Sequence, residues 1–227
     1  MNIKNWDDLR YEIKFIADPT DNYIRIFLDT HPFAFKEVFH PRIIHNIYCD
    51  SELLSAYDEN ISGASERVKV RYRWYEDINT HEMTDITTEL KYKNGKLGGK
   101  KFVKLNKKKS EISDLDMIKL ATEKAPPELT GVLSTYSTPS MYNQYERTYF
   151  VSQDDKIRVT IDTSIMFSPL YIESGEKSRL DIRPFSIIEV KGAPADHQEI
   201  SDFLKDFPYR PYRFSKYVVG IQNGIFS

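Results

Sequence analysis

Alternating polar and apolar residues predict several β-strands in this chain. From Arg67 to Trp74, every odd position is basic and every even position is apolar or aromatic. Successive side chains of a strand point to opposite faces, so the four basic side chains would share one face. Like charges at such spacing repel unless an anion lies among them. Further strands are expected over Leu9–Phe15, Ile43–Cys49, Thr87–Lys93, Tyr145–Val151, Lys156–Asp162 and Ser186–Lys191.

Helix start and stop signals lie between these strands. Capping residues and prolines mark the boundaries, and Asn94-Gly95 and Gly98-Gly99 indicate turns around a lysine-rich connection. No segment of linker composition divides the chain, so we expect a single domain over residues 1–227, a mostly antiparallel sheet with helices interspersed. The expected helices are Tyr23–Leu28, a short helix after Asp50-Ser51 through Tyr57, Ser113/Asp114 to Lys124 before Pro126-Pro127, a helix opened by Pro194-Ala195-Asp196 and running through Leu204, and Phe214–Ile221.

Composition is compatible with one substantial core. The chain has 227 residues, of which 40% are hydrophobic and 13% aromatic, so global disorder is not expected. The net charge of −2 hides an uneven distribution, since residues 91–109 carry nine lysines and no acidic residue. Local arrangement is therefore more informative about partners than net charge.

A single cysteine, Cys49, excludes an intramolecular disulfide and favours a reducing compartment. Its position in an apolar strand indicates a core thiol rather than a nucleophile. The first residues lack the apolar run of a signal peptide, and no segment reaches transmembrane length. We expect a cytoplasmic protein, and a membrane-protein partner is left open.

Charged faces recur from strand to strand, and three of them place one glutamate two residues before a lysine. A solvated sheet face is the simple explanation for any one strand, but the wholly cationic row from Arg67 to Arg73 favours another. If the sheet closes into a barrel, these faces meet around a polyanion such as a chain of phosphates. The few carboxylates would then suit Mg²⁺ or Mn²⁺. The three pairs are Glu12 and Lys14, Glu89 and Lys91, and Glu189 and Lys191.

The ordered series of these motifs resembles the VTC domain, the polyphosphate polymerase module of the triphosphate tunnel (CYTH-like) superfamily. Each motif alone is weak, whereas the series covers nearly the whole chain in order. The wider superfamily begins with Glu-x-Glu-x-Lys, and Arg10 in the first position favours the VTC type over the adenylate cyclase and thiamine-triphosphatase branches. The motifs are Arg10–Phe15, Ile47–Asp50, Arg67–Tyr75, Glu89–Lys91, Tyr145–Phe150, Arg158–Asp162, Glu189–Lys191 and Phe214–Tyr217.

This resemblance implies an α+β fold, an eight-stranded antiparallel β-barrel with peripheral helices. It implies that the terminal phosphoryl group of ATP, or another triphosphate, is transferred to inorganic polyphosphate with Mn²⁺ or Mg²⁺. Glu189 would be the main metal ligand, Glu12 would bind metal or orient Lys14 and Arg10, and Glu89 would pair with Lys91. The implied phosphate-binding residues are Arg10, Lys14, Arg67, Lys69, Arg71, Arg73, Lys91, Arg147, Arg158, Lys191, Ser215 and Lys216.

Alternatives of other classes remain at this point. The same fold could hydrolyse tripolyphosphate or nucleoside triphosphates, or it could bind polyphosphate without catalysis. Lys100 or Lys101 is expected to add a cation to the site. The segment Lys100–Lys109 is otherwise interpreted as a solvated loop. Because Phe102 is its only aromatic residue, we expect no sequence-specific nucleic-acid binding.

Overall fold

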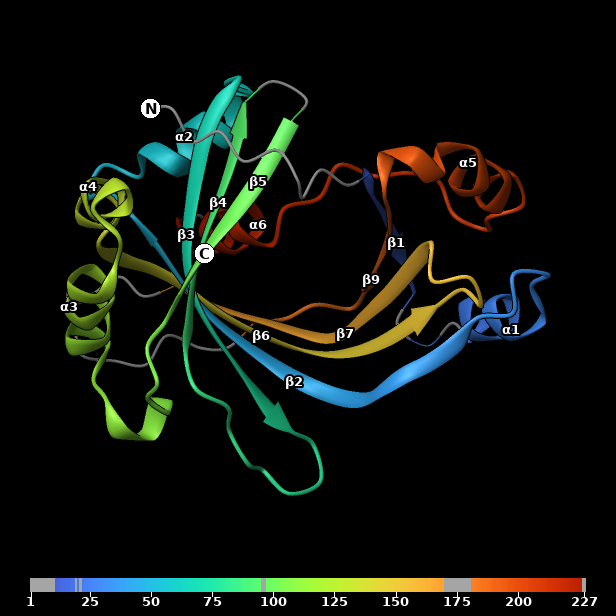
Figure 1. Cartoon of the computed structure of the whole chain (residues 1–227), viewed down its shortest axis with the longest axis horizontal. Coiled ribbons are helices and arrows are strands. Elements are labelled where there is room, and N and C mark those ends of the chain that lie inside the picture. Colours follow the sequence, from blue (N-terminus) through green and yellow to red (C-terminus); the bar gives the residue numbers. More distant parts are fainter. Residues whose placement is uncertain (1–10, 19, 21, 95–96, 170–180, 226–227) are drawn as a thin grey trace.

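The chain folds around one curved antiparallel sheet (Figure 1). The structure is a computed structural model that describes residues 11–18, 20, 22–94, 97–169 and 181–225. The strand order is β1-β9-β7-β6-β2-β3-β4-β5, and β8 is added beside β7. The strands are β1 (Tyr11–Ala17), β2 (Lys36–Asp50), β3 (Glu66–Asp77), β4 (Thr87–Asn94), β5 (Leu97–Lys104), β6 (Thr138–Val151), β7 (Ile157–Pro169), β8 (Asp181–Ile182) and β9 (Ser186–Gly192).

Six α-helices and two short 3₁₀ turns accompany the sheet among the described residues. Ser113 accepts a hydrogen bond from the backbone N–H of Asp116 and so caps α3 as expected. Asp50 accepts from the backbone N–H groups of Ala56 and Tyr57 and stabilises the start of α2. The helices are α1 (Tyr23–Thr30), α2 (Ser55–Ser62), α3 (Asp114–Lys124), α4 (Pro127–Thr135), α5 (His197–Lys205) and α6 (Lys216–Ile225).

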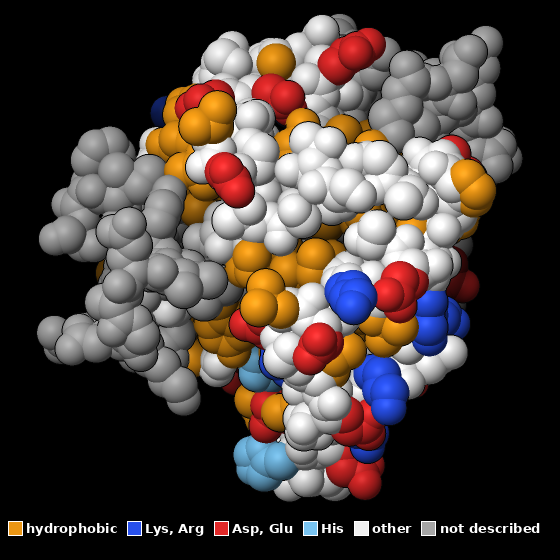
Figure 2. Space-filling view, turned by 90° about the vertical axis from the view of Figure 1, so that its left-hand side faces the viewer, with side chains coloured by type: hydrophobic (Ala, Val, Ile, Leu, Met, Phe, Trp, Pro, Cys, Tyr) orange, Lys and Arg blue, Asp and Glu red, His pale blue; other side chains and the backbone are white. Residues whose placement is uncertain are grey.

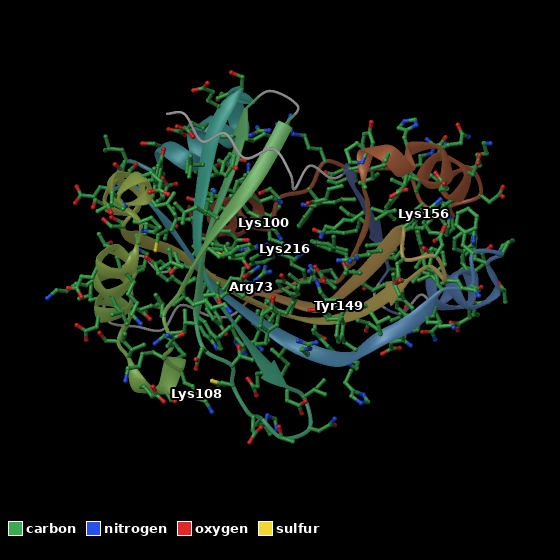
Figure 3. All side chains as sticks on the ribbon, in the orientation of Figure 1. Arg73, Lys100, Lys108, Tyr149, Lys156 and Lys216 are labelled. Atoms are coloured by element: carbon green, nitrogen blue, oxygen red, sulfur yellow. The ribbon has the colours of Figure 1, made fainter. Side chains whose placement is uncertain are left out.

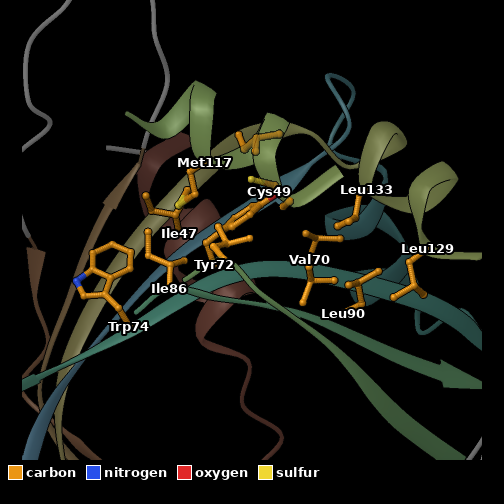
Figure 4. Packing of buried hydrophobic residues seen from close by; sticks show 14 residues of the cluster. Ile47, Cys49, Val70, Tyr72, Trp74, Ile86, Leu90, Met117, Leu129 and Leu133 are labelled. Carbon is orange, nitrogen blue, oxygen red and sulfur yellow. The ribbon is translucent and has the colours of Figure 1, made fainter. Parts of the chain in front are cut away.

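The convex face of the sheet carries two apolar cores. Tyr72, Trp74 and Leu90 pack with residues of α3 and α4 in one of them (Figure 4). Phe15 and Val159 pack with residues of α1 and α5 in the other. These are the apolar positions of the alternating strands, so the predicted division of faces is confirmed. Where α3 and α4 lie, the outer surface shows acidic, basic and apolar side chains intermixed (Figure 2).

The last helix lies on the opposite, concave side of the sheet (Figure 1). Tyr217 and Ile221 of α6 pack against Tyr145, Phe167 and Ile187 on the inner faces of β6, β7 and β9. The inner space is therefore divided: part of it is filled by the apolar side of α6, and the remainder carries charged side chains. The helices at the periphery are thus α1, α3, α4 and α5, while α6 is internal and α2 packs in the same core as α6 through Ala56 and Tyr57.

The predicted α+β class and antiparallel sheet are confirmed, with two differences in local structure. The lysine-rich connection is not a loop up to Lys104, because β5 pairs with β4 in this region. Helix α3 ends at Lys124, before Pro126-Pro127, as expected, but Pro127 also occupies the first turn of α4, a helix that was not predicted. Cys49 is buried in the core, as expected.

The barrel is not closed by backbone pairing within the described residues. β1 and β5 are the two edges of the sheet, and they do not pair with each other. Side chains bridge this opening instead: Lys91 Nζ of β4 lies 3.2 Å from Glu12 Oε2 of β1. Strong curvature is assisted by a β-bulge in β7, where Ser164 has a φ of 50°. The architecture is an open tunnel with its charged face inward.

Candidate functional site

Glu189 lies at the centre of a group of cations on the concave face. Its carboxylate is 3.4 Å from Lys14 Nζ and 3.8 Å from a terminal nitrogen of Arg147. Lys191 Nζ also donates a hydrogen bond to it. Burial alone would raise the pKa of Glu189, but the adjacent cations outweigh burial and hold it well below its usual value. Glu189 is therefore an ionised carboxylate in a buried position.

Asp162 forms a second centre next to the first. Arg147 donates to its two carboxylate oxygens at 2.5 and 2.7 Å, and Lys216 Nζ donates to one of them as well. Burial opposes the charge on Asp162, but Arg147 and Lys216 outweigh it and lower the pKa. Lys216 Nζ also lies 4.4 Å from the centre of the Tyr145 ring. Arg147 contacts both Asp162 and Glu189, so the two centres form one network.

Glu89 is a third centre, on the other side of the tunnel. Arg71 Nε donates to it at 2.7 Å, and a terminal nitrogen of Arg73 lies 3.6 Å away. Burial would raise the pKa of Glu89, but the two arginines lower it to about 2. The predicted pairing of Glu89 with Lys91 is wrong, because β3 and β4 pair with Arg71 directly opposite Glu89.

Glu12 joins two lysines across the opening of the sheet. Its carboxylate oxygens lie 3.1 Å from Lys14 Nζ and 3.2 Å from Lys91 Nζ. Burial and the charge of Glu189 would raise the pKa of Glu12, but the lysines lower it to about 2. Burial lowers the pKa of Lys14, and its carboxylate neighbours outweigh this and raise it. Glu12 thus orients Lys14, one of the two roles expected for it.

Lys69 differs from the other inner cations, because it forms no ion pair with a carboxylate among the described residues and its hydrogen-bond partner is a hydroxyl group. Its Nζ donates to Ser215 Oγ at 3.0 Å and lies 5.9 Å from the centre of the Tyr217 ring. Burial and the like charges of Lys14 and Lys91 lower the pKa of Lys69 to about 7. An added anion beside Lys69 would relieve this repulsion.

The remaining predicted residues lie around this network. Arg67 is half-buried at the start of β3, in register with Lys93 of β4. Arg158 is exposed, and it lies opposite Lys191 of β9. Both share the concave face with the network without belonging to its contacts. Arg10 lies outside the described residues.

Two features of the site were not predicted, and strand register favours one of the two lysines between which the prediction left the choice open. Asp162 was named only as the end of the motif Arg158–Asp162 and not as the partner of Arg147 and Lys216, since strand register brings Arg147 opposite it and the position of α6 brings Lys216. Lys100, rather than Lys101, shares the concave face, because it lies opposite Lys91 in β5. Tyr145 accepts a hydrogen bond from Arg73 at 3.1 Å; its place two residues before Arg147 is the signal that could have found it.

Together these side chains form a cationic surface with an excess of positive charge. Arg73, Lys100 and Lys216 come from different strands and a helix and lie around the same concavity (Figure 3). Eight cations face four carboxylates, which leaves four positive charges when Lys69 is protonated. Such an excess suits a ligand with several negative charges close together, such as a chain of phosphates. The set comprises Lys14, Lys69, Arg71, Arg73, Lys91, Arg147, Lys191 and Lys216, with Glu12, Glu89, Asp162 and Glu189.

The donor set fits a divalent cation only as a partner of bound phosphate. Nowhere in the described part of the chain do three or more His, Cys, Asp or Glu side chains form a group suited to a metal. However, Glu12 and Glu189 are both ionised and both approach the same ammonium, that of Lys14. Mg²⁺ and Mn²⁺ accept one or two carboxylates together with substrate phosphates and water. Glu189 and Glu12 could hold such an ion jointly with a triphosphate.

Comparison with known proteins identifies the family. A crystal structure from Vibrio parahaemolyticus, provisionally described as an adenylate cyclase, superposes with a TM-score of 0.50 at 10% identity, covering 93% of this chain and 97% of that one. It shows a similar fold. An RNA triphosphatase from S. pombe gives a TM-score of 0.20 at 11% identity over 80% of this chain and 81% of that one, too low to support an argument. No curated protein matches. Residues 9–224 match the VTC domain family, and the chain belongs to that family.

Proposed function

We propose that this protein is a polyphosphate polymerase that transfers the terminal phosphoryl group of ATP to inorganic polyphosphate. A terminal oxygen of the polyphosphate attacks the γ-phosphorus of ATP. The bond between that phosphorus and the β,γ-bridging oxygen breaks, and ADP leaves with this oxygen. The reaction needs positioning and charge stabilisation rather than a protein nucleophile. The observation that carries the proposal is the excess of positive charge on the concave face, eight cations against four carboxylates.

Each part of the charged network has a role in this scheme. Arg71, Arg73 and Arg147 present planar donors that match phosphate oxygens, and Lys14, Lys191 and Lys216 add point charges. Their carboxylate partners fix the side chains before the substrate binds, which lowers the cost of orienting them. Mn²⁺ or Mg²⁺, bound through Glu189 and the phosphates, would neutralise charge on the transferred group.

Product analysis tests the proposal directly. The protein is incubated with ATP and Mn²⁺, and the products are separated on a polyacrylamide gel stained for polyphosphate. We expect long polyphosphate chains and ADP. Orthophosphate without chains would reject the polymerase and indicate the hydrolase of the same fold.

A substitution at Glu189 separates catalysis from binding. Glu189→Ala should abolish turnover and leave tripolyphosphate binding intact, because the cations remain and Lys14 and Arg147 keep Glu12 and Asp162 as carboxylate partners. Binding without turnover in the wild type as well would indicate a non-catalytic polyphosphate-binding protein, and equal turnover in both proteins would remove Glu189 from the mechanism. None of the helices in the described part of the chain has the length and hydropathy to span a bilayer. Cytoplasmic location and a membrane-protein partner remain predictions.

A further inference from the structure

A second chemical environment adjoins the phosphate-binding network on the same face. The Arg42 guanidinium lies among three aromatic rings, at 4.7 Å from the centre of Phe39, 5.6 Å from Tyr149 and 5.7 Å from Tyr75. Phe39 and Tyr149 meet edge to face, with their centres 5.5 Å apart. We call Phe39, Arg42, Tyr75 and Tyr149 the Arg42 cluster. None of its members was predicted to be a site residue.

Strand register places the Arg42 cluster on the concave face. Arg42 of β2 lies opposite Arg147 of β6, and Phe39 lies opposite Tyr149. Side chains opposite each other in a sheet share a face, and Arg147 faces inward to Asp162 and Glu189. The Arg147 guanidinium is 5.9 Å from the centre of the Tyr149 ring, so the cluster begins where the phosphate-binding network ends. Tyr149 lies on the floor of the concavity that Arg73 and Lys216 also border (Figure 3).

The Arg42 cluster has features that the core does not explain. Phe39 is 52% exposed, and it belongs to none of the three apolar cores. Arg42 makes no ion pair with a carboxylate within the described residues; its contacts are with rings. An exposed ring and a guanidinium plane on an inward, cationic face both offer flat surfaces for stacking.

We propose that the Arg42 cluster binds the base of a nucleoside triphosphate. This inference rests on the proposed function. A nucleoside triphosphate combines a flat aromatic base with a polyanionic tail, and the concave face carries the complementary surfaces side by side. The base stacks on the Arg42 guanidinium and the Phe39 ring, while Arg147 and its neighbours hold the phosphates. Because stacking tolerates any base, ATP and GTP bind with similar affinity.

Comparison of ATP with inorganic tripolyphosphate isolates the contribution of the base, because only ATP carries one. Both affinities are measured calorimetrically on the full chain without divalent metal, so that neither ligand is turned over. The variants are Phe39→Leu, which removes the exposed aromatic ring, and Arg42→Lys, which keeps the positive charge and removes the planar guanidinium group. The matched control is Phe102→Leu, because Phe102 is 47% exposed and lies on the concave face of β5, opposite Glu89.

We expect Phe39→Leu and Arg42→Lys each to weaken ATP binding about tenfold and to change tripolyphosphate binding by less than about twofold. Phe102→Leu should change neither affinity. Equal weakening of both ligands would overturn the proposal and assign the Arg42 cluster to the phosphate chain. Unchanged ATP affinity in Phe39→Leu and Arg42→Lys would also overturn it. So would a selective loss of ATP affinity in Phe102→Leu. Absence of tripolyphosphate binding in the wild type would instead reject the proposed function, and the base site with it.

Discussion

The two faces of the same strands are held together in different ways. On the convex face of β3, Val70 and Tyr72 are fully buried among apolar side chains. On its concave face, Lys69 and Arg71 depend on individual partners, a hydroxyl group and a carboxylate. Apolar packing is non-directional, whereas a buried charge without a partner is costly.

This difference separates stability from function in the molecule. Apolar packing on the convex face and around α6 contributes folding free energy, whereas the charged part of the concave face carries more positive than negative charge. A substitution on the concave face should therefore act through the partner that it leaves behind. If the partner is a buried ion, folding suffers; if the partner is a hydroxyl group or solvent, ligand binding changes instead.

The largest effect is expected at Asp162, the most buried member of the network. Asp162→Ala leaves Arg147 and Lys216 without their shared carboxylate in a buried site. Removal of one partner from a buried ion pair costs about 3–5 kcal/mol. We expect a loss of this size in the free energy of unfolding, measured by urea denaturation with fluorescence detection.

Two companion variants sharpen this test. Adding Lys216→Met to Asp162→Ala removes one of the stranded charges and should restore part of the stability. Glu12→Ala removes a more exposed carboxylate, and its cost should be no more than about 1 kcal/mol. If Asp162→Ala lowers the free energy of unfolding no more than Glu12→Ala does, pairing of buried charges does not stabilise the fold.

Sequence alternation predicted the division of faces but not the partners across it. A repeat of two residues assigns each side chain to one face of the sheet, and this was sufficient to place the cations of β3 on the concave face. The partner of each cation depends on strand register, a long-range property. Glu89 therefore pairs with Arg71 of the neighbouring strand rather than with Lys91 of its own.

Two further features depended on tertiary contacts. β5 contains glycines and lysines, which disfavour strands, yet it forms beside β4. A Cβ at Gly99 would lie 2.3 Å from Tyr92 Oη, so the glycine gives the Tyr92 ring its space across the two strands. The final helix was predicted from its own residues, but its place inside the tunnel is set by β6, β7 and β9.

A smaller effect concerns the pH dependence of ligand binding at Lys69. Its pKa is lowered to about 7 in the free protein, so above pH 7 the amine is mostly neutral. A bound triphosphate raises this pKa, and binding therefore takes up a proton above pH 7. Affinity should fall as pH rises, by up to about tenfold per pH unit between the free and bound pKa values. Titration calorimetry with tripolyphosphate from pH 6 to pH 9 measures this.

The control for this prediction is Lys69→Met, which removes the titrating group. The ligand's own protonation affects both proteins alike, so the difference between their slopes reports Lys69. Calorimetry in two buffers of different ionisation enthalpy counts the protons taken up. Identical slopes and proton counts in the two proteins would contradict the shifted pKa.

The smallest effect is expected from two neighbouring lysines on the edge strand. Lys100 shares the concave face with Lys91, whereas Lys101 lies opposite Leu90 and points to the convex side. Because Lys100 is exposed, Lys100→Ala should weaken tripolyphosphate binding only about fivefold. Lys101→Ala removes the same charge one residue away and should leave binding unchanged. An equal loss in both variants would mean that β5 attracts the ligand through its net charge, and that the two faces do not differ there.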